Sequence, residues 1–243
     1  MRHPNDLADA PGGSCCGLGV KCAQCGVRTL AVCGVLEEHD LAKLAAIGQS
    51  LRIKAGETLF HEHDEAASVF TVTRGVFKLY KLFDGRCQVI GFMLPGDFIG
   101  LACHETYNYT AEAITEADIC RFASAPYGNL LGQAPAMERR LREYASNQLA
   151  GAQAQMLLLG RMSAQERIAH FLLDMLRRSR GVSYGLVWLP MTRADMADFL
   201  GLTVETVSRG LTAMKRDGLI AIPNRDHIQV LDQVRMSILA KQA

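Results

Sequence analysis

The segment 191–222, which reads MTRADMADFLGLTVETVSRGLTAMKRDGLIAI, most constrains the fold of this chain. Thr192 and Asp195 stand at the spacing of a capping box, which starts a helix. Gly201 follows the apolar residues of that helix and can adopt the left-handed conformation that ends it. Thr203 can then cap a second helix through its side-chain oxygen. Two short helices separated by a glycine turn are therefore predicted.

The second of these helices has an apolar face and a polar face. Its apolar residues recur at helical spacing and are expected to face the core, namely Val207, Leu211 and Met214. Glu205, Ser208 and Arg209 are expected to point away from that core. Arginine pairs with guanine, glutamate accepts from the N4 amine of cytosine, and serine binds either kind of group. The pattern predicts a helix-turn-helix that enters the DNA major groove, and the alternative is the solvated face of an ordinary helix pair.

Composition sets the outer limits. The 243 residues are 49% hydrophobic and 21% charged, which is typical of a globular chain with one large or two small domains. No apolar run is as long as a membrane span and the first 20 residues lack a signal-peptide core, so a cytoplasmic protein is predicted. No enzyme is indicated, because the chain has no Walker loop, G-x-S-x-G or H-E-x-x-H motif. From Arg161 onward the chain has 12 Lys and Arg but only 8 Asp and Glu. This excess of positive charge suits contact with phosphates.

Cysteine usage is the second strong signal. All eight cysteines lie at or before Cys120, and they are Cys15, Cys16, Cys22, Cys25, Cys33, Cys87, Cys103 and Cys120. In a cytoplasmic protein, crowding near the N-terminus points to metal or redox chemistry more than to structural disulfides. Cys22, Cys25 and Cys33 form a C-x2-C-x7-C pattern, so three thiolates can converge on one site. A fourth ligand from elsewhere in the fold would suit an iron–sulfur cluster or zinc.

The rest of the chain is read from its periodicity. Residues 1–20 have little periodicity and are expected to be a mobile tail, and 37–47 is expected to be a short helix. Short β-like runs separated by glycine turns predict a small antiparallel barrel or jelly roll; they are 51–53, 58–60, 69–73, 76–82, 87–93 and 119–122. The stretch 126–135, bounded by prolines, is expected to break the pattern.

A long helix is predicted over 136–162, with an apolar seam at spacings of three and four. The seam predicts dimerisation or packing on the helix's own domain, and its central members are Leu141, Leu149, Ala152, Met156 and Leu159. Another amphipathic helix is expected over 165–178. Two strands at 219–222 and 228–231 predict a wing with Arg225 at its tip, within reach of a phosphate. The fold class is therefore α+β, with an antiparallel β-roll, a long helix and a C-terminal winged helix-turn-helix.

In this order of parts, the chain resembles the CRP/FNR superfamily of transcription regulators and most of all its oxygen-sensing FNR branch. Three features carry the resemblance: GLTVETVSRGLTAMKRDGLI, the C-x2-C-x7-C motif with a later cysteine in ADICRF, and the LPGDFIG run of the β-roll. The x7 spacing matches the FnrN/FnrL-like subgroup. The resemblance implies a cysteine-rich segment over 1–35, a β-roll sensor domain over 36–135, a dimerisation helix over 136–163 and a DNA-binding domain over 164–243.

The resemblance also implies a function. It assigns a [4Fe–4S] cluster to Cys22, Cys25, Cys33 and Cys120. With the cluster intact, a homodimer would bind a palindrome of the TTGAT…ATCAA type and act with RNA polymerase on genes of anaerobic or microaerobic metabolism; oxygen would degrade the cluster and silence the regulator. Arg209 would read the guanine, Glu205 the opposing cytosine and Ser208 a neighbouring thymine.

The chain departs from relatives that bind cyclic nucleotides. Gly100 is followed by Leu101 rather than glutamate, and no arginine lies between Arg86 and Arg121. A buried phosphate without a cation is unfavourable, so no cyclic nucleotide is expected. Cys87 and Cys103 are expected to be ordinary small residues of the β-roll. Cys16 could replace a ligand, and a zinc-stabilised or thiol-redox regulator using the same cysteines is the competing interpretation.

Overall fold

The computed structural model describes residues 22–101, 105–178 and 185–241. The expectations for the tail 1–20, with Cys15 and Cys16, and for Cys103 lie outside these residues. The chain divides into two compact units, and the long helix α3 (Pro135–Arg161) passes from one to the other after Leu149. The first unit contains the β-roll except Leu82–Val89, and the second contains those residues together with 150–243.

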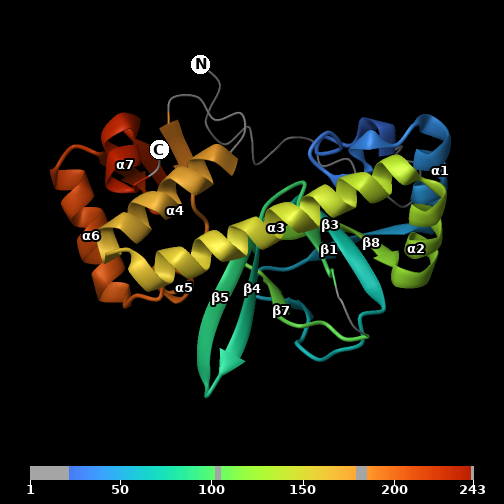
Figure 1. Cartoon of the computed structure of the whole chain (residues 1–243), viewed down its shortest axis with the longest axis horizontal. Helices are drawn as coiled ribbons and strands as arrows, with labels where there is room; N and C mark the ends of the chain where they lie inside the picture. Colours follow the sequence, from blue (N-terminus) through green and yellow to red (C-terminus); the bar gives the residue numbers. More distant parts are fainter. Residues whose placement is uncertain (1–21, 102–104, 179–184, 242–243) are drawn as a thin grey trace. The chain divides into compact units, whose positions relative to one another are not determined.

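The β-roll consists of two four-stranded antiparallel sheets (Figure 1). One sheet has the order β1-β8-β3-β6, formed by Gly48–Ile53, Ala117–Ala123, Ser68–Arg74 and Phe98–Ile99. The other has the order β2-β7-β4-β5, formed by Thr58–Phe60, Thr110–Ala113, Phe77–Phe83 and Arg86–Met93. The predicted jelly roll and all six predicted strands are confirmed. The structure adds β6, which has only two residues, and β7, which pairs with β2 and β4.

Both faces of the β1-β8-β3-β6 sheet are covered. Val72 and Ile119 pair across β3 and β8 and belong to a core that the other sheet closes. Their neighbours Thr71 and Cys120 pair on the opposite face, because successive side chains of a strand alternate. This second face is covered by the cysteine segment and three helices. Cover on both faces explains why the consecutive residues Phe70, Thr71 and Val72 of β3 are all buried.

The helices over this second face are α1 (Glu38–Ile47), α2 (Ser124–Gln133) and the first turns of α3. The stretch 126–135 ends the run of strands, as expected, but it was not predicted to be a helix, and it forms most of α2. Tyr127 and Leu130 are one turn apart and both buried in the core, which stabilises the helix. Pro126 lies in the first turn, where its missing N–H would have had no intrahelical partner.

Helix α3 has 27 residues and its apolar seam changes environment along its length. Met137 is fully buried, and Leu141 packs against the core of the first unit. Leu149 and Met156 are 62% and 65% exposed, and Ala152 between them is also exposed. Leu159 is half-buried. The first part of the seam thus serves the helix's own domain, and the middle part presents an uncovered apolar surface.

The second unit is a winged helix-turn-helix (Figure 1). Its helices are α4 (Ala164–Arg178), α5 (Arg193–Leu200), α6 (Val204–Arg216) and α7 (Gln233–Leu239). The wing β10–β11 (Ile220–Asn224 and His227–Val230) is confirmed, and β9 (Leu186–Trp188) extends it to three strands. None of the helices in the described ranges is both long and apolar enough to cross a membrane.

Candidate DNA interface and cysteine site

Local hydrogen bonds hold the turn between α5 and α6. The Asp195 N–H donates to the Thr192 hydroxyl at 3.1 Å, and the Asp195 carboxylate accepts from the Thr192 N–H at 2.9 Å. Gly201 ends α5 with a φ of 61°, in the left-handed region. Thr203 caps α6 by accepting from the Thr206 N–H at 3.1 Å. The predicted capping box, glycine turn and second cap are all confirmed.

Helix α6 is anchored by its apolar face. Its predicted inward residues Val207, Leu211 and Met214 are buried. Gly210 lies on the same face, where a Cβ would come within 2.5 Å of the Ile168 side chain on α4. The absent side chain lets α6 pack closely on α4, so that the opposite face of α6 is held outward.

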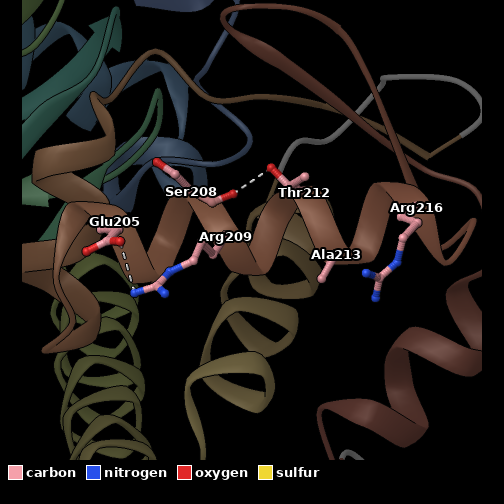
Figure 2. Close-up of a pocket in the computed structure, with 6 residues that line it drawn as sticks. All are labelled: Glu205, Ser208, Arg209, Thr212, Ala213 and Arg216. Carbon is pink, nitrogen blue, oxygen red and sulfur yellow. Dashed lines mark hydrogen bonds and ion pairs between the residues drawn. The ribbon is translucent and has the colours of Figure 1, made fainter.

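That outward face carries the predicted base-reading residues. An open depression of about 300 Å³ is lined by six side chains of α6: Glu205, Ser208, Arg209, Thr212, Ala213 and Arg216 (Figure 2). Arg209 forms an ion pair with Glu205 at 3.2 Å, one turn earlier, and both side chains are more than 70% exposed. The Thr212 hydroxyl donates to the Ser208 carbonyl oxygen at 2.8 Å. Glutamate four residues before arginine is the favourable orientation of such a pair, which contributes about 0.2–0.5 kcal/mol to the stability of the helix.

Sequence reasoning missed half of this face. Thr212, Ala213 and Arg216 were not predicted to contribute, although they follow Ser208 and Arg209 at spacings of one and two helical turns. Extending that spacing along the helix would have found them. The Arg225 side chain is exposed at the tip of the wing, as expected. Nearby, Asn224 Oδ1 accepts a hydrogen bond from the Asp226 N–H at 3.1 Å and orders this tight turn.

The C-terminal end of α5 is held by side chains from two other helices of the second unit. Gln155 on α3 donates to the Phe199 carbonyl at 2.8 Å. Arg167 on α4 donates to the Leu200 carbonyl at 2.9 Å. Its other two guanidinium nitrogens donate to carbonyls at the end of α3, to Leu159 at 2.8 Å and to Met162 at 2.9 Å. The last carbonyls of a helix have no intrahelical partners, so one guanidinium satisfies two helix ends together.

Arg167→Met is expected to destabilise the second unit by about 2 kcal/mol or more, because three backbone carbonyls lose a charged donor in a half-buried site. Urea unfolding of the full chain measures this. Arg161→Met is the matched control, since Arg161 is an exposed residue at the end of α3. Equal stability of the two variants would show that the three hydrogen bonds contribute nothing.

The cysteine segment is a compact set of turns. Two 3₁₀ helices, η2 (Cys22–Gln24) and η3 (Val32–Val35), lie at its ends. The Cys25 N–H donates to the Cys22 carbonyl at 3.2 Å, and the Leu36 N–H donates to the Cys33 carbonyl at 3.1 Å. The Arg28 guanidinium donates to the Leu36 carbonyl at 2.7 Å and closes the segment. These bonds fold three cysteines that are spread over the segment into one small unit.

All four predicted ligand residues line one cavity. This cavity of about 20 Å³ is bordered by Cys22, Cys25, Cys33, Cys120, Val27, Ala31, Leu44, Thr71, Thr73 and Phe122. Cys22 and Cys120 are buried, and the other two cysteines are half-buried. Within 22–101, 105–178 and 185–241 there is no group of three or more His, Cys, Asp or Glu side chains that could hold a metal ion as it stands. The thiols therefore share a cavity without forming a ready-made ion site.

Apart from Thr71 and Thr73, the side chains around the four cysteines are apolar or aromatic. Tyr127 on α2 packs against Phe98 and Phe122, with ring centroids 5.6 and 5.5 Å away. Burial raises the pKa of Tyr127, and the nearby Cys33 thiolate raises it further. Cys87 is half-buried on β5 and does not border the cavity.

Gly34→Ala is expected to distort the cysteine segment. A Cβ at Gly34 would lie 2.4 Å from the Arg28 carbonyl oxygen, so the backbone must move. Overpacking of this kind costs about 1–3 kcal/mol. Limited proteolysis of the segment and thermal unfolding measure the effect. Gly26→Ala is the control, because a Cβ there meets nothing within 4 Å. The same behaviour in both variants would contradict the expectation.

Comparison with known proteins agrees with this architecture. Residues 166–237 match the Crp-like helix-turn-helix domain family, and residues 50–133 match the cyclic nucleotide-binding domain family. The nitrogen fixation regulation protein FixK of Bradyrhizobium diazoefficiens is 44% identical over 223 residues, which cover 90% of this chain and 93% of the relative. The transcriptional activator protein FnrL of Cereibacter sphaeroides is 37% identical over 223 residues, which cover 89% and 90%.

Solved structures agree as well. The structure of FixK2 from Bradyrhizobium japonicum superposes with a TM-score of 0.75 at 34% identity, covering 79% of this chain and 97% of that one. FixK and FnrL are FNR-branch transcription regulators and not enzymes, in line with the sequence prediction. The β-roll, the winged helix-turn-helix and these relatives together show that the chain belongs to the CRP/FNR family of transcription regulators.

Proposed function

We propose that this chain is an oxygen-responsive transcription activator that binds palindromic DNA as a homodimer, with a [4Fe–4S] cluster held by Cys22, Cys25, Cys33 and Cys120. The observation that carries the proposal is the shared cavity, in which three cysteines of the N-terminal segment meet the distant Cys120 of β8. A helix-turn-helix alone would support a DNA-binding regulator but would not indicate what it senses.

The residues around the cavity fit a cluster of this type. Four thiolates are its ligand set, and each thiolate binds a different iron, so the four sulfurs need not converge as closely as around one ion. Val27, Ala31, Leu44 and Phe122 border the cavity and limit access of water. The bound cluster would supply the oxygen-reactive group.

The chain's own residues connect this cavity to the long helix. Cys22 and Cys120 belong to the same buried cluster as Met137 at the start of α3, and Leu141 and Tyr144 pack against that cluster. The Tyr144 hydroxyl also donates to the Phe98 carbonyl at 3.0 Å. Ligation would tighten the cysteine segment against this core, and loss of ligation would loosen the packing of the first turns of α3. We propose that this packing carries the oxygen signal to the dimer.

Anaerobic purification with an absorption spectrum and metal analysis tests the cluster. A brown protein with about four iron and four sulfide per chain supports it. A colourless protein with one zinc would instead support a zinc-stabilised regulator, since four thiolates also bind zinc. A protein with neither metal would favour a thiol-redox regulator.

On DNA, the proposed target is a palindrome of the TTGAT…ATCAA type, as the resemblance to the FNR branch implies. Arg209 would read guanine and Glu205 the opposing cytosine, and Ser208 would contact a neighbouring thymine. Arg216 at the C-terminal end of α6 and Arg225 at the tip of the wing are exposed cations, and both suit phosphate contacts. The chain would act with RNA polymerase in the bacterial cytoplasm. No cyclic nucleotide is proposed as a ligand of the β-roll.

The homodimer is proposed to form along the middle of α3, where Leu149, Ala152 and Met156 are exposed. Apolar side chains at this spacing suit a helix–helix seam. No carboxylate occurs between Glu143 and Glu166, so two copies could approach without repulsion, and some dimer is expected to persist when the cluster is lost. Sedimentation of the protein with and without cluster, at matched concentration, tests this, and a purely monomeric cluster-free form would contradict it.

Ala152→Asp is expected to make the free energy of dimerisation about 1–2 kcal/mol less favourable, because the two carboxylates of the dimer would face each other across the seam. Ala154→Asp introduces the same charge on the opposite side of the helix and is the matched control. Sedimentation equilibrium measures both dissociation constants. If Ala152→Asp dimerised as well as Ala154→Asp, the seam would lie elsewhere on α3.

A further inference from the structure

Thr71 on β3 lies directly opposite Cys120 on β8 in the antiparallel register. Residues paired in this way project to the same face of the sheet, with neighbouring Cβ atoms. Both residues border the cavity together with the three cysteines of the N-terminal segment. Thr71 is therefore the cavity residue whose side chain is placed beside the Cys120 sulfur by the sheet itself.

The Thr71 hydroxyl is buried and has no hydrogen-bond partner among the described residues. The residue is 7% exposed, and across the described residues no hydrogen bond is found for its hydroxyl. Thr73 borders the same cavity, and its hydroxyl does have a partner: it donates to the Asp118 carbonyl at 2.9 Å. Buried hydroxyls are nearly always hydrogen-bonded, so an exception that borders a ligand cavity points to a group that belongs there.

We propose that the Thr71 hydroxyl donates a hydrogen bond to the Cys120 sulfur when that sulfur is a cluster ligand, and that this bond sets the cluster's reduction potential and its lifetime in oxygen. The inference rests on the proposed function, because it needs a ligated Cys120. A threonine hydroxyl rotates freely enough to aim its proton at a neighbour, and a thiolate is an acceptor with negative charge. Thr71 is thus a positioning and tuning residue and not a ligand.

The direction of the effect follows from electrostatics. A donor aimed at a ligating sulfur stabilises the more negative, reduced form, and hydrogen bonds to sulfur are among the factors that set iron–sulfur potentials. Removing the donor lowers the reduction potential and makes oxidation by oxygen easier. Valine keeps the shape of threonine without the hydroxyl, and serine keeps the hydroxyl without the methyl group.

The experiment compares wild-type protein, Thr71→Val, Thr71→Ser and Ser50→Ala after anaerobic reconstitution of the full chain. Ser50 is the control because it pairs with Cys120 from the other side, on β1, but does not border the cavity. Iron and sulfide content, the reduction potential by spectroelectrochemistry and the decay of cluster absorbance in air-saturated buffer are measured.

Thr71→Val is expected to take up iron and sulfide as the wild type does, to have a lower reduction potential and to lose its cluster roughly two- to tenfold faster in air, the factor that corresponds to one hydrogen bond. Thr71→Ser and Ser50→Ala are expected to match the wild type. If Thr71→Val fails to fold or to take up iron, Thr71→Ala carries the same comparison.

A Thr71→Val cluster with the wild-type potential and lifetime would overturn the inference and leave the proposed function standing. An equal change in Ser50→Ala would also overturn it, because the effect would then not depend on the cavity. A wild-type protein that takes up no cluster would overturn both, and only that result would count against the proposed function.

Discussion

Replacing Cys120 by serine is expected to abolish cluster assembly, leaving iron and sulfide at background after anaerobic reconstitution. Cys120 is 5% exposed and comes from the sheet, whereas the other three thiols come from the N-terminal segment. Its loss would remove the proposed ligand that joins the segment to the β-roll. Serine at Cys22, Cys25 or Cys33 is expected to have the same result, and binding of the palindrome without oxygen should fall with it.

Cys87→Ser is the matched control for this series. Cys87 is half-buried on a strand of the same β-roll but does not border the cavity, so this variant should keep the full spectrum. A Cys120→Ser protein that retained a full cluster would show that the fourth ligand lies elsewhere, and Cys16 would be the next residue to test.

Arg209→Ala is expected to weaken specific binding by about 1–3 kcal/mol, or roughly 5- to 100-fold, and to relax the choice of base at the guanine position. Arg209 is exposed on the outward face of α6, where it forms an ion pair with Glu205 at 3.2 Å, so its guanidinium is accessible to a base edge. Binding assays at one fixed salt concentration, on the palindrome and on a guanine-substituted site, measure both effects.

Arg216→Ala provides the comparison, because Arg216 is a cation two turns along the same face. As a phosphate contact it should weaken binding about equally on both DNA sites and reduce the salt slope by about one. If Arg209→Ala discriminated guanine as well as the wild type does, another residue of the face would be the reader.

The sequence predicted the elements whose signals are local. The capping box of Thr192 and Asp195, the turn at Gly201 and the cap at Thr203 are all present in the structure. Each depends on contacts within three or four residues, so short-range pattern is sufficient to identify it. The same is true of the amphipathic helix α4, whose inward residues recur at helical spacing.

Elements that depend on distant partners were missed or misread. The stretch containing Pro126 was expected only to end the run of strands, and its helix was not predicted: Tyr127 and Leu130 pack into a core made by α1 and the sheet. Strands β6 and β9 have two and three residues, and they exist only because β3 and β11 lie beside them. No short-range pattern carries that information.

The same division applies to the functional residues. The amino-acid sequence by itself determined the outward face of α6 and the spacing of three cysteines, because periodicity along one helix or one short segment is a local property. Only the tertiary structure decided that Cys120 borders their cavity, that Thr71 lies beside it with a buried hydroxyl, and that Leu141 is covered while Leu149 is exposed on the same seam. These facts depend on which strands pair and which faces are covered, and such contacts join residues far apart in the chain.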